Sequence, residues 1–134
     1  MSPARKNHFG DLERAILEVL WGPEGDPRPS DEWLTVRDVQ AVLSESRGTA
    51  YTTVMTVLDR MVTKGLVERE KGSRAHSYRP ARSRQETTVQ LMSSILGEFS
   101  DGERHSALMA FVREVPESDR QALRDALAAL EGDS

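Results

Sequence analysis

The chain has 134 residues, enough for one compact domain with a small appended element, and it contains no cysteine. Without cysteine there is no disulfide framework, no thiolate metal site and no cysteine nucleophile. The formal net charge of −4, taken alone, argues against a nucleic-acid-binding protein. Residues 1–21 lack the pattern of a signal peptide, and no apolar run approaches the roughly 20 residues of a membrane-spanning helix. We therefore expect a cytoplasmic protein that does not insert into the membrane.

Charged residues are distributed unevenly along the chain. Residues 47–84 hold nine Lys and Arg against three Asp and Glu, a surplus of six positive charges, and we call them the basic segment. Residues 1–46 hold five basic against nine acidic residues, and residues 85–134 hold four against ten. A basic segment in an acidic protein indicates a surface for a polyanion, and a solvated charged surface is the alternative.

The first predicted helix covers residues 10–21, with Gly10 as its N-cap. Residues 22–34 follow, and their three prolines and two glycines break the helix. This composition predicts a long surface loop whose far end is anchored by Trp33 and Leu34. The apolar side chains at helical spacing in the first helix are Leu12, Ala15, Ile16, Val19 and Leu20.

Two further helices are predicted before the middle of the chain. Thr35 is a plausible N-cap for a short helix over residues 35–46, and Thr49 for a longer one over residues 49–64. Gly65 is expected to end the longer helix in a left-handed conformation. Two helices joined by a few residues that include glycine are typical of a helix-turn-helix. Their apolar faces consist of Val36, Val39, Val42 and Leu43 in the first and of Val54, Val57, Leu58 and Met61 in the second.

A β-hairpin is predicted next. Residues 66–69 and residues 76–79 alternate in polarity, Pro80 ends the second run, and residues 71–75 form a tip around Gly72. Three helices followed by a basic hairpin are the element order of a winged helix. The sequence thus predicts a mainly α fold with a small β-hairpin, in which a winged helix-turn-helix domain precedes a helical C-terminal region.

The exposed face of the longer helix carries an unusual number of threonines. Threonine is a mediocre helix former, but it offers a hydroxyl to base edges and a methyl group to thymine. In a helix-turn-helix this helix enters the DNA major groove with its N-terminus first. The alternatives are a neutral surface for the threonines, packing under the wing for the tyrosine and packing on the second helix for the methionine. The predicted base-reading residues are Tyr51, Thr52, Thr53, Met55 and Thr56.

Polar and basic residues flank the same helix and line the hairpin. Such side chains suit phosphates, which position a protein on DNA without specifying the sequence. For Arg60, an ion pair with an acidic residue of the first helix is the alternative. The residues predicted to contact the DNA backbone are Arg47, Thr49, Arg60, Lys64, Lys71, Arg74 and His76.

The last third of the chain predicts three short amphipathic helices over residues 86–99, 103–115 and 116–132. We expect the last of them to start at Pro116 and to be capped by Ser118. Short helices with wide apolar stripes need a partner surface, which predicts an isologous homodimer. Completion of the monomer core is the alternative.

We divide the chain into a DNA-binding domain at residues 1–81 and a helical dimerisation region at residues 82–134. A dimer gives a DNA reader two half-sites related by the symmetry of the operator. The expected partners are therefore double-stranded operator DNA and a second copy of the chain. The predicted dimerisation residues are Leu96, Phe99, Leu108, Phe111, Leu123, Leu127 and Leu130.

Other classes of function have little support in the sequence. The chain lacks a glycine-rich phosphate loop, a GxSxG elbow and an HExxH motif, so we expect no enzymatic activity and no cofactor. His8, His76 and His105 lie too far apart in sequence for a metal site. A winged-helix interaction module that does not bind DNA specifically is an alternative, which the basic segment disfavours. A repressor of other genes that senses a ligand is a further alternative.

Four stretches of the sequence resemble the penicillinase-repressor family of the BlaI/MecI type, in particular its actinobacterial members. They are "GDLERAILEVLW", "TVRDVQAVLS", "AYTTVMTVLDRMVTKGLVEREKGSRAHSYRP" and "LMAFVREVPESDRQALRDALAAL". The resemblance runs from about Phe9 to Glu131, and the tail "LxRMxxKGLVxR" of the central run is quite specific. Only the loop "GPEGDPRPSDEW" is longer than the family pattern.

This resemblance implies a homodimeric winged-helix repressor of genes for β-lactamase or penicillin-binding proteins and of its own operon. It also implies a further partner, a membrane sensor protease that ends repression by cutting the dimerisation region. The family's cleavage position corresponds to the bond between Ala110 and Phe111. Cleaved members of the family have Asn before that Phe, where this chain has Ala110. The cysteines of the copper-responsive branch of the superfamily are absent here.

Overall fold

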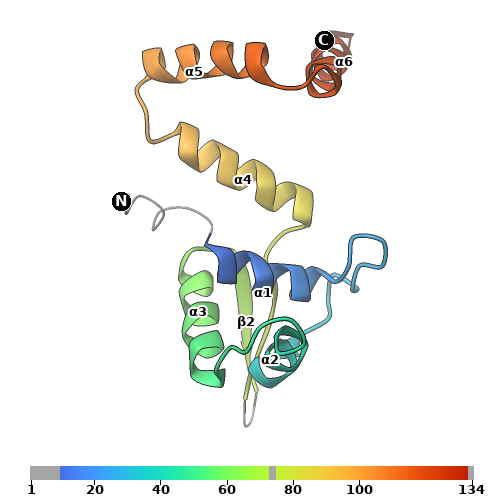
Figure 1. Ribbon diagram of the computed structural model, residues 1–134, viewed down its shortest axis with the longest axis vertical. Helices are drawn as coiled ribbons and strands as arrows, with labels where there is room; N and C mark the ends of the chain where they lie inside the picture. The colour runs from blue at the N-terminus through green and yellow to red at the C-terminus, as the bar shows by residue number, and fades with distance from the viewer. Residues whose placement is uncertain (1–9, 73–74, 133–134) are drawn as a thin grey trace. The chain divides into compact units, whose positions relative to one another are not determined.

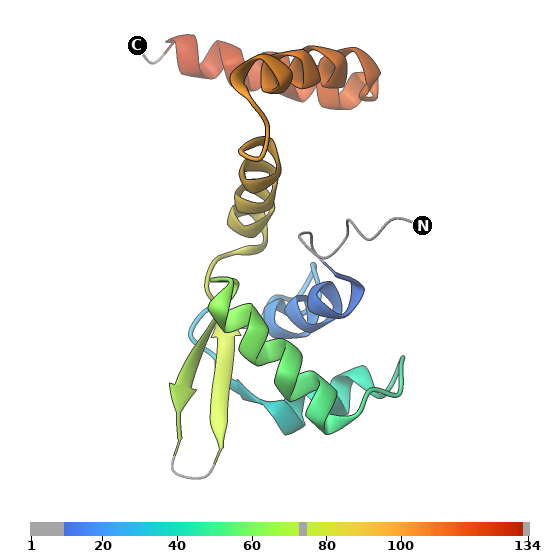
Figure 2. The ribbon, with the colours of Figure 1, turned by 90° about the vertical axis from the view of Figure 1, so that its left-hand side faces the viewer.

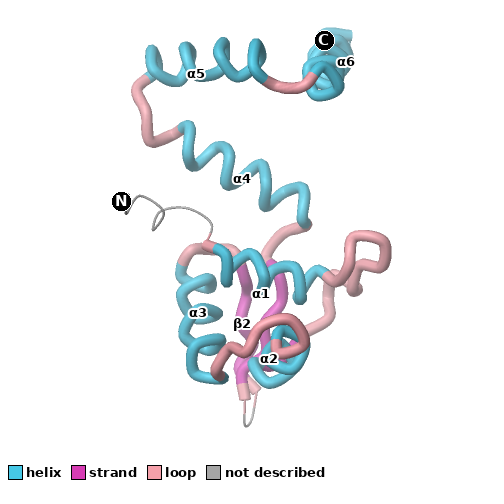
Figure 3. The backbone as a smooth tube through the Cα atoms, in the orientation of Figure 1, coloured by secondary structure: helices cyan, strands magenta, loops and turns pink. Residues whose placement is uncertain are grey.

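A computed structural model describes residues 10–72 and 75–132 (Figure 1). The chain forms two compact units that meet between Ser93 and Ser94. The first unit contains three helices, a small antiparallel sheet and most of a fourth helix, and the second contains two further helices. Helices, strands and loops are distinguished in Figure 3. No helix of the described ranges is long and apolar enough to cross a membrane.

Helix α1 (Asp11–Trp21) begins where predicted, with Gly10 as its N-cap in an extended conformation. The carboxylate of Glu13 accepts a hydrogen bond from the Gly10 amide at 3.1 Å, which satisfies one of the amides left free at a helix start. The apolar stripe turns inward, and Ile16 and Leu17 are fully buried. Each such side chain stabilises the fold by about 1.5 to 3 kcal/mol relative to exposure.

Helix α2 (Val36–Leu43) is closed at its start by a capping box. Thr35 Oγ1 accepts from the Asp38 amide at 3.1 Å, and Asp38 Oδ2 accepts from the Thr35 amide at 3.0 Å. The predicted apolar stripe was wrong at one position, because Val42 is 38% exposed while the rest of the stripe is buried.

Helix α3 (Tyr51–Thr63) carries the predicted buried face of Val54, Val57, Leu58 and Met61. Its N-cap is Ala50, so the prediction of Thr49 as cap was wrong. Ala50, directly before the helix, has extended backbone angles. Thr49 lies one residue earlier, and its carbonyl accepts a hydrogen bond from the side-chain amide of Gln40 at 3.2 Å. Gly65 has φ of +80°, which confirms the left-handed end of this helix.

The predicted hairpin is confirmed, but its first strand covers residues 67–71 and not 66–69, so Lys71 lies in a strand and not in the tip. Strands β2 (Val67–Lys71) and β3 (His76–Pro80) pair antiparallel, with Arg69 opposite Tyr78. A third strand, β1 (Leu34–Thr35), pairs with β3 and gives the order β1-β3-β2. The prediction missed β1 because two residues are too short to show alternation. Tyr78 lies at the centre of the sheet and is 1% exposed.

Helices α1 to α3 and the sheet enclose one apolar core. In Figure 2 the hairpin stands beside the three helices, and the N-terminal end of α3 lies toward the same end of the domain as the end of β2 and the start of β3. This arrangement confirms the predicted winged helix within a mainly α fold.

The loop between α1 and β1 folds back on the end of α1. The Arg28 amide donates to the Trp21 carbonyl at 2.7 Å, and Arg28 Nε donates to the Val19 carbonyl at 2.8 Å. Gly22 has φ of +83°, and a Cβ there would lie 2.7 Å from the Arg28 nitrogen, so only glycine fits.

Helix α4 (Arg84–Leu96) then starts against the winged domain, where Thr87 is 2% exposed. The functional division that we placed between residues 81 and 82 therefore comes earlier in the chain than the boundary between the two compact units, which lies between Ser93 and Ser94.

The second unit consists mainly of α5 (Asp101–Glu114) and α6 (Glu117–Gly132). Ser100 caps α5 through the Glu103 amide. The prediction that Ser118 caps the last helix was wrong, because α6 already includes Glu117.

Arg120 ties the two helices of the second unit together. It donates to the carbonyls of Val112, Arg113 and Val115 at the end of α5, at 3.0 to 3.3 Å. Its Nη1 also donates to Glu117 Oε1 at 2.6 Å. The hydrogen bond from Arg124 holds the pKa of Glu117 below its ordinary value.

Candidate nucleic-acid interface

The threonines of α3 lie on the face opposite its buried stripe. Thr52, Thr53 and Thr56 are exposed, and within the described ranges their hydroxyls have no hydrogen-bond partner. Thr63, near the end of the same helix, behaves differently, because its Oγ1 donates to the Asp59 carbonyl at 3.4 Å. Three unengaged hydroxyls therefore stand on the N-terminal part of a helix whose rotation the core fixes.

Tyr51 and Met55 stand beside the threonines, and each is partly exposed, at 36% and 38%. The guanidinium of Arg37, on α2, lies over the Tyr51 ring at 5.6 Å from its centroid. This cation–π contact connects the two helices of the helix-turn-helix. Sequence reasoning missed Arg37. The available signal was its place just after the N-cap of α2, on the face opposite Val39.

Lys64 is engaged inside the domain. Its Nζ lies 2.8 Å from Glu13 Oε2, and the Glu13 side chain is 8% exposed. An almost buried carboxylate needs such a partner, because an uncompensated charge there is costly. The ion pair that we considered between α3 and an acidic residue of α1 therefore exists, but it is made by Lys64 and not by Arg60.

Other members of the basic segment are paired as well. Arg69 contacts Asp59 at 3.1 Å, and Arg79 contacts Glu68 at 2.9 Å across the hairpin while stacking on the Trp33 ring. Some arginine and lysine side chains of α2, α3, the hairpin and their connections form no ion pair with an acidic residue. Among the described residues these are Arg37, Arg47, Arg60, Lys71 and Arg82.

The guanidinium of Arg82 donates hydrogen bonds to the Gly65 carbonyl and to Gln90 Oε1. Arg37, Arg47, Arg60 and Lys71 thus remain as the cations available to a polyanion, and we call them the free cations.

One carboxylate joins α3 to the middle of the hairpin. Asp59 Oδ1 accepts hydrogen bonds from the Tyr78 hydroxyl at 2.9 Å and from Arg69 Nη1 at 3.1 Å. Burial of the phenol, together with its hydrogen bond to Asp59, raises the pKa of Tyr78 to about 12. Because Arg69 and Tyr78 face each other across the two strands, Asp59 holds both strands at once.

The hairpin tip presents two further predicted residues. Lys71 and His76 pair in register and are both exposed. The Gly72 amide donates to the Ala75 carbonyl at 3.1 Å, and a Cβ on Gly72 would lie 2.3 Å from that oxygen. Glycine is therefore needed for this tight turn. The predicted backbone contact Arg74 lies outside the described residues.

The helices of the second unit bury none of their residues within the described chain. The predicted dimerisation residues are instead exposed, with Leu127 at 58% and Leu130 at 68%, and Leu96 is partly exposed. The predicted cleavage position, Ala110 and Phe111, lies inside α5, and the Phe111 carbonyl accepts from the Val115 amide at 3.0 Å. The other exposed apolar side chains here are Ile95, Phe99, Leu108, Met109, Phe111, Val112 and Leu123.

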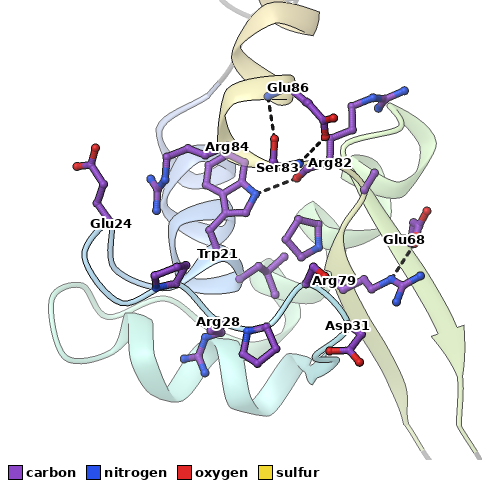
Figure 4. A pocket seen from close by; sticks show the side chains of 16 residues that line it. Trp21, Glu24, Arg28, Asp31, Glu68, Arg79, Arg82, Ser83, Arg84 and Glu86 are labelled. Carbon is purple, nitrogen blue, oxygen red and sulfur yellow. Dashed lines mark hydrogen bonds and ion pairs between the residues drawn. The ribbon is translucent and has the colours of Figure 1, made fainter.

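A cavity of about 500 Å³ lies between the loop after α1 and the start of α4 (Figure 4). Its arginines are committed to internal contacts. Arg84 contacts Glu18 and the Gly22 carbonyl and stacks on the Trp21 ring, and Trp21 Nε1 donates to the Arg82 carbonyl at 3.0 Å. These contacts fasten the first turn of α4 to the winged domain.

No cluster of three or more histidine, aspartate or glutamate side chains able to hold a metal is found among residues 10–72 and 75–132. His8 lies outside the described residues.

The site as a whole consists of an exposed helix face with free cations near it, and the second unit has uncovered apolar helices.

A winged helix followed by uncovered amphipathic helices is the architecture of a winged-helix transcription regulator. The penicillinase repressor family matches residues 9–129, and the chain belongs to that family. The Transcriptional regulator BlaI of Mycobacterium tuberculosis, from strains CDC 1551 and H37Rv, is 43% identical over 129 residues, which are 96% of this chain and 88% of the relative. The family consists of regulators, which agrees with our expectation that the chain is not an enzyme.

Proposed function

We propose that this protein is a homodimeric transcriptional repressor that binds a palindromic operator through α3 and the hairpin. The observation that carries the proposal is the row of unengaged threonine hydroxyls on the exposed face of α3. Short side chains on a fixed helix can reach base edges in the major groove, where donors, acceptors and the thymine methyl distinguish all base pairs.

Within this proposal Thr52, Thr53 and Thr56 read bases, and Tyr51 and Met55 contact the DNA beside them. Phosphate contacts come from the free cations and from His76, with Thr49 at the start of α3. We assign Lys64 to the internal pair with Glu13. Removing Lys64 from that pair would leave a nearly buried carboxylate without its partner.

The proposed dimer rests on the uncovered second unit. Monomeric proteins rarely expose contiguous apolar patches of more than a few hundred Å², and α5 and α6 expose apolar side chains along both helices. A second copy of the same helices would cover them in an isologous interface. The proposed interface uses Leu96, Phe99, Leu108, Phe111, Leu123, Leu127 and Leu130.

The proposed targets are genes for β-lactamases or penicillin-binding proteins and the repressor's own operon, on the strength of the family. The proposed relief of repression is a cut between Ala110 and Phe111 by a membrane sensor protease. A protease needs an extended segment, so α5 must open locally. Because α5 buries no residue in the single chain, opening it there costs its helical hydrogen bonds and the contacts of Arg120 but disrupts no apolar core.

Mobility-shift titrations test the DNA-binding part of the proposal. The purified protein is titrated against its own upstream promoter region and against scrambled DNA of equal length in physiological salt. We expect nanomolar binding to the promoter alone, with two protomers bound at each site and an affinity that falls as salt rises. Equal weak binding to both DNAs would contradict the proposal and favour the interaction module.

Mass spectrometry tests the proteolytic part. The repressor is recovered from cells before and after treatment with a β-lactam, and a fragment that ends at Ala110 is expected only after treatment. An intact chain in cells that have induced the target gene would contradict cleavage at this bond. A release by a bound ligand would then be the alternative to examine.

A further inference from the structure

A small cleft of about 200 Å³ lies between the N-terminal part of α3 and the hairpin. Val36, Met55 and Tyr78 line it from α2, α3 and β3, and Tyr51 and His76 also contribute to its wall. At this size the cleft is below the range of pockets that enclose a small-molecule ligand. It suits a protruding part of a larger ligand.

Two cations stand next to residues that line the cleft. Within the described residues, no acidic side chain lines it. Arg37 lies over the Tyr51 ring, and Lys71 stands opposite His76 in the hairpin. Cations around an apolar floor match a sugar between two phosphates, because the sugar has apolar C–H groups and each neighbouring phosphate carries a negative charge.

We propose that this cleft seats the deoxyribose of one DNA strand and that Asp59 sets the width of the cleft. The inference rests on the proposed function, because the occupant is part of the operator. It also accounts for the exposure of Met55, an apolar side chain among polar ones. In the complex its thioether covers the sugar, while the threonines on the neighbouring part of α3 contact bases.

Asp59 controls the cleft through Tyr78. The Tyr78 ring lines the cleft and its hydroxyl donates to Asp59 Oδ1, which also accepts from Arg69. Asp59 thus holds both strands of the hairpin to α3, β2 through Arg69 and β3 through the Tyr78 hydroxyl. Asp59 is a positioning residue in this scheme, because it does not line the cleft and acts through the Tyr78 ring and the hairpin.

Hydroxyl-radical footprinting tests this seat, because the radical attacks exposed deoxyribose. On the operator, the wild-type protein is expected to protect a short run of sugars on one strand of each half-site. In Met55→Ala those sugars become reactive again, while protection elsewhere remains and the affinity falls about three- to tenfold. In Met55→Trp the side chain fills the cleft, so the same sugars lose protection and the affinity falls further.

Val42→Ala is the matched control, because Val42 is 38% exposed like Met55 but does not line the cleft. It should leave the footprint unchanged. Tyr78→Phe keeps the ring and removes the bond to Asp59, so protection at the cleft should weaken while the contacts of the threonines persist. Circular dichroism confirms that each variant is folded.

A wild-type footprint that Met55→Ala and Met55→Trp both leave intact would overturn the seat while leaving the proposed operator binding in place. A wild-type protein with no footprint on the operator would overturn the proposed function and this inference with it.

Discussion

At the scale of single residues, the interface is defined by which side chains are free. Thr52, Thr53 and Thr56 have unengaged hydroxyls, whereas Lys64 and Arg69 are bound within the chain. Base reading and phosphate contact should therefore respond differently to mutation. In the proposed complex a threonine change should alter discrimination between sequences, and a free-cation change should alter the general affinity for DNA.

Thr53→Ala and Thr56→Ala should each lower the preference for operator over random DNA by about 1 to 3 kcal/mol, because each removes a base contact. Arg60→Ala should weaken binding to both DNAs alike and reduce the salt slope of binding by about one, as expected for a lost phosphate contact. Titrations by fluorescence anisotropy at several salt concentrations measure both quantities. An equal loss on both DNAs for the threonine variants would contradict their role in base reading.

The raised pKa of Tyr78 predicts a dependence of stability on alkaline pH. The folded-state pKa is about 12 against an ordinary value of 10, so the folded chain holds this proton more tightly than the unfolded chain. The stabilisation by Tyr78 is complete below pH 10 and is lost as the pH rises from 10 to about 12.

Urea unfolding at several pH values measures this loss as the difference between the wild type and Tyr78→Phe. That difference should shrink above pH 10, because the variant lacks the titrating hydroxyl. A difference that stays constant from pH 9 to pH 12 would show that the hydroxyl is not buried against Asp59.

At the scale of helices and strands, the ends of α3 determine how it is presented. Its N-cap, Ala50, offers no side-chain hydrogen bond, which leaves the first amides of the helix unsatisfied by side chains and suited to an anion. The helix ends at Thr63, and Gly65 follows its C-cap Lys64, so that the Leu66 amide donates to the Met61 carbonyl at 2.9 Å. The left-handed residue turns the chain directly into β2 and so fixes where the hairpin starts.

Gly65→Ala should destabilise the protein by about 1 to 2 kcal/mol, because an L residue is strained at φ of +80°. Crowding does not contribute, since nothing lies within 4 Å of a Cβ added there. Gly48→Ala is the matched control, with an equally open position and no positive φ. Thermal unfolding should show a lower Tm for Gly65→Ala alone, and similar Tm values for both variants would contradict the strain.

Most of this fold follows from patterns in the sequence, and the misses have local causes. Helical spacing predicted α1 to α3, and alternation predicted the hairpin. The strand β1 is too short to alternate, and the cap of α3 moved from Thr49 to Ala50 because the backbone and not the side chain decides it. The pairing of Lys64 with Glu13 joins residues 51 positions apart, which no local pattern reveals.

At the scale of the whole molecule, the winged domain has a core of its own, whereas the described residues of the second unit form none. The core residues all belong to the first unit, while α5 and α6 bury none of theirs. In the proposed dimer the second unit obtains its core from another chain. Its stability then depends on protein concentration.

Leu123→Asp and Leu127→Asp should give monomers that bind a full operator far more weakly, because a charge in an apolar interface is costly and a half-site supplies only part of the contact. Ser118→Asp is the control, since it adds the same charge to the first turn of α6, where the helix dipole favours it. Sedimentation velocity measures the association. A monomeric wild type would contradict the dimer.

The internal pairing of the basic segment has a consequence for how such a regulator finds its operator. Over the described residues, the chain has four free cations: Arg37, Arg47, Arg60 and Lys71. Since the salt slope is about −0.9 per neutralised phosphate, a dimer that used all four cations of each chain would have a slope of about −7. Its hold on random DNA, which rests on phosphates alone, would then weaken steeply as salt rises. The preference for an operator would rest on the threonines of α3 and not on the cations.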